Sequence, residues 1–351
     1  MDAITFEHVD VVFGNRAGQK AALDLIDQGA DRSKVLEETG AVVGVRDATL
    51  CIDEGEICVL MGLSGSGKSS LLRCVNGLNT VSRGKVLIAD SGGTVDVASC
   101  DAATLRRLRT DRIAMVFQQF ALMPWRTIRE NVGLGLELRG LSRTERDRLV
   151  DEKLALVRLD QWADKHPHEL SGGMQQRVGL ARALATDADI LLMDEPFSAL
   201  DPLIREHLQE ELLDLQRSLK KTIVFVSHDL DEALKIGTHI AIMEGGRIVQ
   251  YGRPEEIVTQ PANDYVRAFV GKVNPLNVLC AVSLMRPARD GEDIDRERAV
   301  GLDTPMRELV ALARDRGGTF PVLDGSGTVL GMIGEHEIYD GLLRRRSGDA
   351  L

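Results

Sequence analysis

Gly62-Leu63-Ser64-Gly65-Ser66-Gly67-Lys68-Ser69 is the most informative stretch of this chain, because it matches the pattern GxxxxGK[ST] of a phosphate-binding loop. Its glycines allow consecutive backbone N–H groups to turn inward around phosphate oxygens, at the positive end of the following helix. We expect Lys68 to reach the β- and γ-phosphates of a nucleotide and Ser69 to offer a hydroxyl to Mg²⁺. A buried strand over 56–61 and a helix over 68–78 are expected on either side of the loop.

A second motif lies downstream, where the apolar run Ile190-Leu191-Leu192-Met193 ends in Asp194 and Glu195. A carboxylate at the end of a buried strand can hold Mg²⁺ through water, which is the role we expect for Asp194. Glu195 is one residue further on, where it could orient and deprotonate an attacking water. An apolar strand that ends in Asp-Glu is common, so this motif gains its meaning from the phosphate loop upstream.

The third motif is Leu170-Ser171-Gly172-Gly173-Met174-Gln175-Gln176-Arg177. A Ser-Gly-Gly at the start of a helix presents a hydroxyl and free N–H groups to an anion. With the two preceding motifs, the chain resembles the ABC ATPase family over residues 4–270, with Met174 in place of the commonest glutamine. The resemblance implies that Ser171, Gly172 and Gly173 complete the nucleotide site of an opposite subunit.

Further landmarks of that family follow in the expected order. Gln118 matches the glutamine that senses Mg²⁺ and the attacking water, and residues 198–201 match the loop that crosses the dimer interface. His228 matches the switch histidine on the γ-phosphate. Phe13 is expected to stack on adenine by resemblance to the aromatic residue of the family, with a buried core phenylalanine as the alternative. A zinc site is not expected, because the five cysteines show no CxxC spacing, and we interpret them as reduced thiols.

The alternation of apolar runs predicts an α/β fold. Strands are expected over 4–13, 41–52, 189–193, 222–226 and 238–243, with helices over 202–218 and 230–236, which favours a largely parallel sheet covered by helices. Residues 18–38 read as an inserted helical segment and residues 84–97 as a hairpin broken at 91–93. The resemblance implies a RecA-like core, an antiparallel β subdomain and a helical subdomain over 127–186. We expect an ATPase domain over 1–271, a linker over 272–301 and a small α/β tail over 302–351.

Composition argues for an ordinary globular protein and against two other classes. The chain has 351 residues, 44% hydrophobic and 28% charged. Its apolar runs are too short to span a bilayer, and its first residues resemble a strand rather than a signal peptide. The net charge of −11 argues against a nucleic-acid partner. We therefore expect a protein that stays in the cytoplasm, and the resemblance to ABC ATPases implies that partner subunits attach it to the cytoplasmic face of the bacterial inner membrane.

Three features resemble a narrower family, the ATPases of glycine betaine, choline and proline uptake. They are the insertion at 21–40, the run 62–73 with its Leu63, and the tail, in which residues 320–325 and 329–333 resemble a CBS motif. One CBS-like motif would have to pair with the copy in a second chain, or the tail packs without a ligand. Trp125 departs from the small basic or His residue of many relatives; it either faces the membrane subunit or is a buried packing residue.

We thus expect an ATPase that powers solute import, with two copies closing on two ATP-Mg²⁺ and coupling to transmembrane permease subunits and, indirectly, to a substrate-binding protein. An importer of another solute such as an amino acid, a regulatory ATP-binding module, and a small-molecule kinase are the alternatives. The expected catalytic residues are Glu195, His228 and Gln118, and the Mg²⁺ ligands are Ser69, Gln118 and Asp194. The expected ATP-binding residues are Phe13, Gly62, Leu63, Ser64, Gly65, Ser66, Gly67, Lys68, Ser69, Ser70, Ser171, Gly172 and Gly173.

Overall fold

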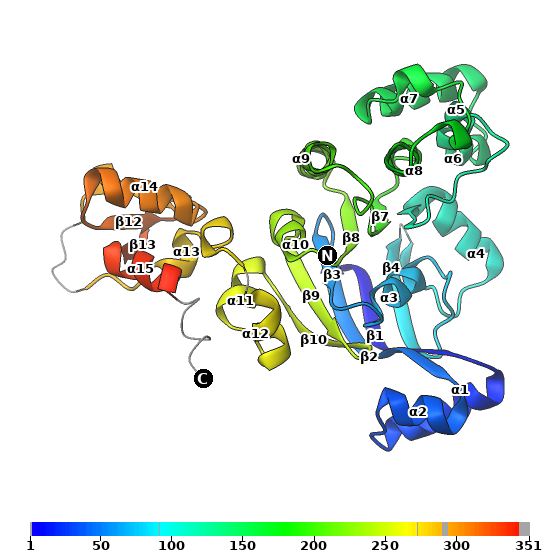
Figure 1. The fold of residues 1–351 in the computed structure, drawn as a ribbon, viewed down its shortest axis with the longest axis horizontal. Helices are drawn as coiled ribbons and strands as arrows, with labels where there is room; N and C mark the ends of the chain where they lie inside the picture. The colour runs from blue at the N-terminus through cyan, green and yellow to red at the C-terminus, as the bar shows by residue number, and fades with distance from the viewer. Residues whose placement is uncertain (1, 91, 272, 290–293, 344–351) are drawn as a thin grey trace. The chain divides into compact units, whose positions relative to one another are not determined.

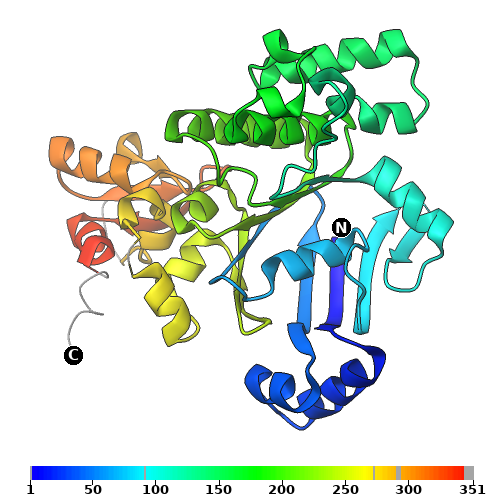
Figure 2. The same ribbon diagram turned by 45° about the vertical axis from the view of Figure 1, so that its right-hand side comes forward.

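The computed structural model describes residues 2–90, 92–271, 273–289 and 294–343. Two compact units share these residues (Figures 1 and 2). The larger is formed by Met1–Asp229 and Ala241–Val249, and the smaller by Leu230–Ile240 and Gln250–Leu351. The motifs identified in the sequence, from Phe13 to His228, all belong to the larger unit.

A six-stranded sheet carries the phosphate loop, in the order β10-β9-β3-β8-β7-β6. Its centre is parallel: β3 pairs with β8, β8 with β7, and β7 with β6. Every residue of β3, β7 and β8 is buried, which explains why these strands are continuous apolar runs. The bounds are β3 (Ile57–Met61), β6 (Ile113–Val116), β7 (Ile190–Asp194), β8 (Thr222–Ser227), β9 (His239–Glu244) and β10 (Arg247–Gly252).

An antiparallel sheet of four strands in the order β2-β1-β4-β5 forms the second layer. Its strands are β1 (Asp2–Phe13), β2 (Val42–Asp53), β4 (Arg83–Asp90) and β5 (Gly93–Asp96). The hairpin expected over 84–97 is β4 and β5, and of its expected break Ser91 lies outside the described residues. One hydrophobic core joins both sheets, with Ile4 and Phe6 from one sheet and Leu60 and Val226 from the other.

Helices cover the six-stranded sheet. Helix α3 (Lys68–Val75) follows the phosphate loop, and α4 (Ala102–Arg107) continues into a short π-helix (Leu108–Arg112). The range predicted to be helical holds α5 (Ile128–Val132), α6 (Leu134–Leu138), α7 (Arg143–Leu156) and α8 (Gly172–Ala185), with short 3₁₀ turns at Asp160–Trp162 and Pro167–Glu169. Helix α9 (Pro202–Leu219) precedes β8.

The prediction for the insertion between the first two strands is confirmed. Two helices, α1 (Arg16–Asp27) and α2 (Arg32–Thr39), connect β1 to β2 (Figure 1). Asn15 caps α1 and Asp31 caps α2, each accepting a backbone N–H with its side chain. Gly40, with φ of 65°, ends α2 in the left-handed conformation that favours glycine.

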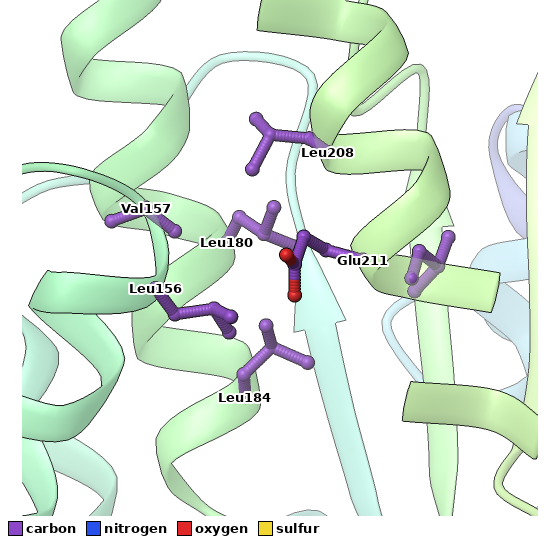
Figure 3. A pocket seen from close by; sticks show the side chains of 7 residues that line it. Leu156, Val157, Leu180, Leu184, Leu208 and Glu211 are labelled. Carbon is purple, nitrogen blue, oxygen red and sulfur yellow. The ribbon is translucent and has the colours of Figure 1, made fainter. Parts of the chain in front are cut away.

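Leucines from α7, α8 and α9 meet around a small cavity (Figure 3). Leu156, Leu180, Leu184 and Leu208 line it, and its volume is about 10 Å³. A space of that size holds at most one water molecule, so it is a packing gap between helices and no ligand site.

The smaller unit has its own hydrophobic core, centred on Phe320, Val322 and Ile333. Leu279 and Leu284 also pack into this core. Thus part of the segment predicted as a linker over 272–301 belongs to the packed unit, because its apolar side chains have a core to enter. The elements are α10 (Leu230–Ile236), α11 (Pro254–Thr259), α12 (Asp264–Val270), 3₁₀ turns at Pro275–Asn277 and Arg296–Arg298, α13 (Ala281–Leu284), β11 (Val300–Gly301), α14 (Met306–Arg316), β12 (Phe320–Leu323), β13 (Val329–Ile333) and α15 (Glu335–Leu343).

The tail over 302–343 has the helix, strand, turn and strand that its sequence predicts. Helix α14 precedes β12, and the antiparallel pair β12 and β13 is joined through a turn in which Asp324 accepts hydrogen bonds from Ser326 and Thr328. Residues 344–351 of the expected tail, Lys272, and residues 290–293 of the expected linker lie outside the described residues. The assignment of the tail over 302–343 as a CBS motif stays a prediction.

Helix hydrophobicity, the five cysteines and Trp125 can now be compared with the sequence analysis. Within the described ranges, no helix is long and apolar enough to cross a bilayer. All five cysteines are free thiols. The alternative that Trp125 is a buried packing residue is wrong, since its side chain is 73% exposed.

Asn131 fixes the loop that carries Trp125. Its buried amide nitrogen donates to the carbonyls of Met123, Arg126 and Thr127, and its Oδ1 accepts from the Met123 N–H. We expect Asn131→Ala to lower the free energy of unfolding by about 2 kcal/mol, because it leaves these buried groups unpaired. Urea unfolding followed by circular dichroism measures this change. Arg143→Ala, at an exposed side chain of α7, is the control; equal midpoints for the two variants would contradict the prediction.

Candidate active site

Close backbone packing shapes the phosphate loop. A Cβ added to Gly62 would lie 2.2 Å from the carbonyl oxygen of Met243, and one added to Gly67 would lie 2.3 Å from that of Gly44. Both glycines have positive φ, of 151° and 103°. Only glycine fits these positions without moving the loop. Gly67 is also the N-cap of α3 and offers no side chain to the first N–H groups of that helix, so these groups can donate to an anion.

A cavity of about 620 Å³ opens in front of this loop, a size that suits a nucleotide. It brings together most of the residues expected to bind ATP and to catalyse its hydrolysis. Gly62, Leu63 and Ser66 of the expected set are not part of its lining; Ser66 is buried. The lining consists of Phe13, Arg32, Val42, Gly44, Ser64, Gly65, Gly67, Lys68, Ser69, Ser70, Gln118, Glu195 and His228.

The Lys68 ammonium curls back onto its own loop. Its Nζ donates to the carbonyl oxygen of Gly62 at 2.8 Å and to that of Leu63 at 3.1 Å. Burial lowers the pKa of Lys68, and the nearby carboxylates of Glu195 and Asp194 oppose that shift. Two backbone carbonyls therefore hold the ammonium beside the cavity, and a phosphate oxygen could replace them as the hydrogen-bond acceptor.

Asp194 joins helix α3 to strand β7. Its carboxylate is fully buried, and it accepts the Ser69 hydroxyl at 2.7 Å and the Arg73 guanidinium at 2.9 Å. Ser69 and Arg73 are four residues apart on α3, so both face the same side of the helix. The predicted pair Ser69 and Asp194 is thus in direct contact. Arg73 was not predicted, although its spacing from Ser69 is a signal that the sequence contains.

Glu195 contacts both of the other expected catalytic residues. Its Oε2 accepts from Gln118 Nε2 at 3.1 Å and is 3.5 Å from Nδ1 of His228. Its backbone is left-handed, with φ of 50°, which is uncommon for a non-glycine residue. The backbone N–H donates to the Val226 carbonyl at 3.2 Å. The structure therefore brings Gln118, Glu195 and His228 together, as predicted.

Phe13 lies at the end of β1 on the rim of the same cavity. Its side chain is 41% exposed, which excludes the alternative of a buried core phenylalanine. Its ring lies against the backbone of Gly44, where a Cβ would come within 2.6 Å of the ring atom Cε2. The ring carbons Cε2 and Cδ2 thus pack on Gly44, and the exposed part of the ring remains for a base to stack on.

The signature residues begin helix α8, away from this cavity. Ser171 is the N-cap, and its Oγ accepts from the Met174 N–H at 3.4 Å. Ser171, Gly172 and Gly173, all within the described part of the chain, do not line the cavity around Lys68. The geometry of one chain therefore leaves them available to a different nucleotide site.

Gln176, five residues after Ser171, makes contacts at the site that the sequence did not indicate. Its side chain is buried; Nε2 donates to the Glu195 carbonyl at 3.1 Å, and Oε1 accepts from the Ala199 N–H at 3.1 Å. Gln176 thus links the signature helix to the catalytic glutamate and to the loop over 198–201. Arg182 of the same helix donates to the carbonyls of Phe120 and Ala121, and so holds the segment after Gln118.

Comparison with known proteins gives a consistent result. The family model described as ABC transporter matches residues 45–198, and a model for an AAA domain (putative AbiEii toxin, Type IV TA system) matches residues 163–234. The glycine betaine/proline betaine transport system ATP-binding protein of Escherichia coli is 51% identical, over 80% of this chain and 68% of its own length. The glycine betaine/carnitine transport ATP-binding protein of Listeria monocytogenes is 49% identical, over 81% and 70%.

Another relative and two solved structures extend this similarity. The glycine betaine transport ATP-binding protein of Bacillus subtilis is 45% identical, over 94% of this chain and 76% of its own length. A bacterial ABC transporter cassette solved as a dimer superposes with a TM-score of 0.62 at 32% identity, covering 72% of this chain and 98% of the cassette. The same cassette in a post-hydrolysis state with ADP and Pi gives 0.61 at 31% identity, with the same coverage.

Two glycines of the phosphate loop provide a matched test of the backbone packing. Gly62→Ala places a methyl group on the Met243 carbonyl, whereas a Cβ on Gly65 has no atom within 4 Å. We expect Gly62→Ala to abolish ATP binding in equilibrium titrations. In Gly65→Ala the only cost is the backbone strain of a positive φ of 78°, so this variant should still bind ATP, with a modest loss of affinity. Equal affinities of the two variants would show that the close packing at Gly62 does not shape the site.

Gln176→Leu tests the link between the signature helix and Glu195. We expect kcat for ATP hydrolysis to fall about tenfold, because the Glu195 carbonyl loses a buried hydrogen bond and its carboxylate loses its fixed orientation. The Kd for ATP of the single chain should stay within about twofold, since Gln176 does not line the cavity. A variant with unchanged kcat would remove Gln176 from the mechanism. Gln175→Leu, which removes bonds to the Pro167 and Leu170 carbonyls on the same helix, is the control.

Proposed function

The chain belongs to the ATP-binding subunits of ABC transporters, an ATPase family, and on that premise we propose that it powers import of a quaternary ammonium solute of the glycine betaine type. The observation that carries the ATPase part of the proposal is one cavity that gathers Lys68, Ser69, Gln118, Glu195 and His228 in front of the phosphate loop, and the relatives carry the solute class. Its residue types and spacing suit phosphoryl transfer to water, in which catalysis depends on positioning and on stabilised charge.

The contacts of several expected residues support a role for each of them. The loop N–H groups and Lys68 bind the phosphate chain, and Phe13 stacks on the base. Glu195 accepts a proton from the attacking water, while Gln118 and His228, which contact its Oε2, orient that water and the γ-phosphate. The 20% exposure of the Glu195 side chain leaves it open to the water and shielded from bulk solvent.

The residues at Asp194 fit a magnesium ion. Mg²⁺ prefers hard oxygen ligands and is usually bound through one or two carboxylates plus phosphate oxygens and waters. The Ser69 hydroxyl and the buried Asp194 carboxylate supply such oxygens 2.7 Å apart, and Gln118 faces the same cavity. When bound, magnesium neutralises charge that develops on the phosphate oxygens. Arg73 holds the Asp194 carboxylate through its other oxygen, Oδ2.

A second copy of the chain completes the site. Ser171, Gly172 and Gly173 start α8 outside the cavity of their own chain, where they can meet the nucleotide of a partner. Solved cassettes with the same fold are dimers, which supports this arrangement. Two chains that close head to tail would then hold two ATP molecules between them.

The membrane role follows from the relatives. Their names assign them to transport systems for glycine betaine, proline betaine and carnitine, so we propose a solute of this quaternary ammonium class, choline included. Transmembrane permease subunits would hold the protein at the cytoplasmic face of the bacterial inner membrane, and a substrate-binding protein would deliver the solute to them. The exposed Trp125, in a loop fixed by Asn131, is a suitable contact for a permease.

Glu195→Gln tests the mechanism and the transport function together. We expect it to bind ATP with nearly unchanged affinity, to lose at least ~99% of phosphate release, and to accumulate as a dimer in size-exclusion chromatography with ATP. In the complete transporter, the variant should abolish ATP-driven uptake of labelled glycine betaine. Glu145→Gln, at an exposed residue in the first turn of α7, is the control for the charge change.

Two results would contradict this proposal separately. Normal phosphate release by Glu195→Gln would remove Glu195 as the base while leaving the transport role intact. An active wild-type transporter that hydrolyses ATP but takes up no quaternary ammonium solute, and takes up an amino acid instead, would refute the substrate class.

A further inference from the structure

The inserted helices α1 and α2 form a fixed platform beside the cavity. Ala22 and Ile26 of α1 and Val35 of α2 are buried against Val12 and Val43 at the facing ends of β1 and β2. The insertion therefore has a small core of its own, continuous with the strands that position Phe13. Because apolar packing holds both helices, side chains on them have defined positions relative to the cavity.

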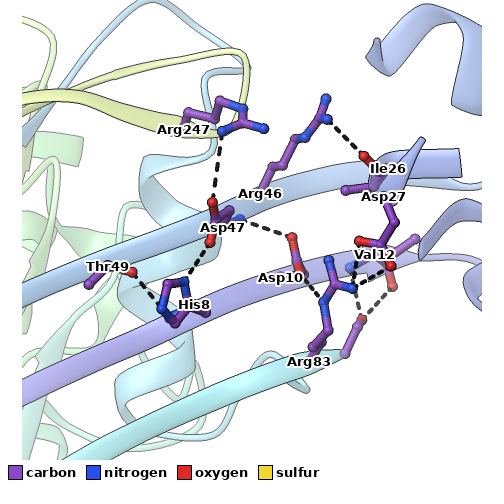
Figure 4. Close-up of polar contacts among 11 residues, drawn as sticks. His8, Asp10, Val12, Ile26, Asp27, Arg46, Asp47, Thr49, Arg83 and Arg247 are labelled. Atoms are coloured by element: carbon purple, nitrogen blue, oxygen red, sulfur yellow. Dashed lines mark hydrogen bonds and ion pairs between the residues drawn. The ribbon is translucent and has the colours of Figure 1, made fainter. Parts of the chain in front are cut away.

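Polar contacts fix the loop between the two helices (Figure 4). From β2, Arg46 donates to the carbonyls of Ala30 at 2.7 Å and Ile26 at 3.0 Å. From β4, Arg83 donates to Asp27 at 2.7 Å and to the buried Asp10 at 2.7 Å. Two guanidinium groups of the antiparallel sheet thus hold the turn that leads into α2.

Arg32, the first residue of α2, reaches the phosphate loop from this platform. Its Nη1 donates to the carbonyl oxygen of Gly65 at 2.9 Å, and its side chain lines the cavity together with Lys68 and Phe13. Thirty-three positions separate Arg32 from Gly65 in the sequence, so only the fold of the insertion brings them together.

The charge and shape of Arg32 suit a phosphate group. A guanidinium has five N–H donors, and within the described part of the chain Arg32 uses one of them in its bond to Gly65. The other N–H donors of Arg32 are on a partly buried side chain that lines the nucleotide-sized cavity. Guanidinium groups form paired, charge-assisted hydrogen bonds with phosphate oxygens.

We propose that Arg32 is a nucleotide-binding residue, supplied by the insertion, that contacts the phosphate chain of ATP beside Lys68. This inference rests on the proposed function, since it assigns a further contact to the same ATP site. It also gives the insertion a role: the packed platform carries a second permanent positive charge to the phosphate loop.

The test separates a phosphate contact from mere support of the loop. Arg32→Gln removes the charge and keeps an amide N–H donor on a shorter side chain, whereas Arg32→Lys keeps the charge and loses the guanidinium. We expect this variant to raise the Kd for ATP about tenfold, the weight of a charge-assisted hydrogen bond, and to leave the Kd for adenosine unchanged. The difference between variant and wild type should shrink as NaCl rises, because salt screens a contact between charges. Equilibrium titration of the full chain measures both constants.

Lys34→Gln is the matched control, because it removes the same charge from the same helix. The Lys34 ammonium is exposed, lies 3.8 Å from Glu38, and is not part of the cavity lining. We expect wild-type affinity for this variant. Arg32→Lys should recover part of the loss, since it restores the charge without the planar fork.

Three outcomes would overturn the assignment of Arg32. Unchanged ATP affinity in Arg32→Gln would leave it as a support for the loop, and equal losses for ATP and adenosine would place it at the base instead of the phosphates. An equal loss in Lys34→Gln would reduce the effect to general charge. Failure of the wild-type chain to bind ATP would refute the proposed function itself.

Discussion

Close contact between backbones at the phosphate loop is the constraint on which the structure depends. Gly67 packs on the carbonyl of Gly44 in β2, and Gly62 packs on that of Met243 in β9, so one strand from each sheet presses on the loop. The turn after β9 adds hydrogen bonds: Gly246 N–H donates to the Ser66 carbonyl at 3.0 Å, and its own carbonyl accepts from Arg46 N–H at 2.8 Å. The loop is thus in contact with a strand of each sheet, and these protein contacts define its shape.

The sequence predicted most of the sheet, and where it failed the reason is physical. Strands such as β7 and β8 are buried on both faces and read as apolar runs, which periodicity detects. Strand β6 was missed because it has four residues and directly follows a π-helical turn. Strand β10 was missed because it is at the edge of the sheet, where all of its residues except Gly252 are partly buried or exposed and no apolar run is needed.

Some residues of the site could be predicted from short local motifs, whereas others depend on contacts between distant parts of the chain. Lys68, Ser69, Asp194 and Glu195 could be predicted because their roles are encoded in short motifs next to a buried strand. Arg32 could not, because the helical pattern of the insertion does not show where its helices pack, and only that packing brings Arg32 to its partner Gly65. Buried contacts of this kind depend on tertiary structure, whereas motifs depend on the few residues around a phosphate.

The left-handed backbone of Glu195 is fixed by contacts that connect this residue to helix α8. A left-handed glutamate is costly and persists only where neighbours fix it. Here Val226 accepts its N–H, while Gln176 and the Ser198 hydroxyl both donate to its carbonyl at 3.1 Å. Gln176 belongs to α8, the helix that Ser171 begins. In the proposed dimer, the helix that meets the nucleotide of the partner therefore also holds the base of its own chain. The position of α8 and the backbone conformation of Glu195 are thus fixed together, through the bond between Gln176 and the Glu195 carbonyl.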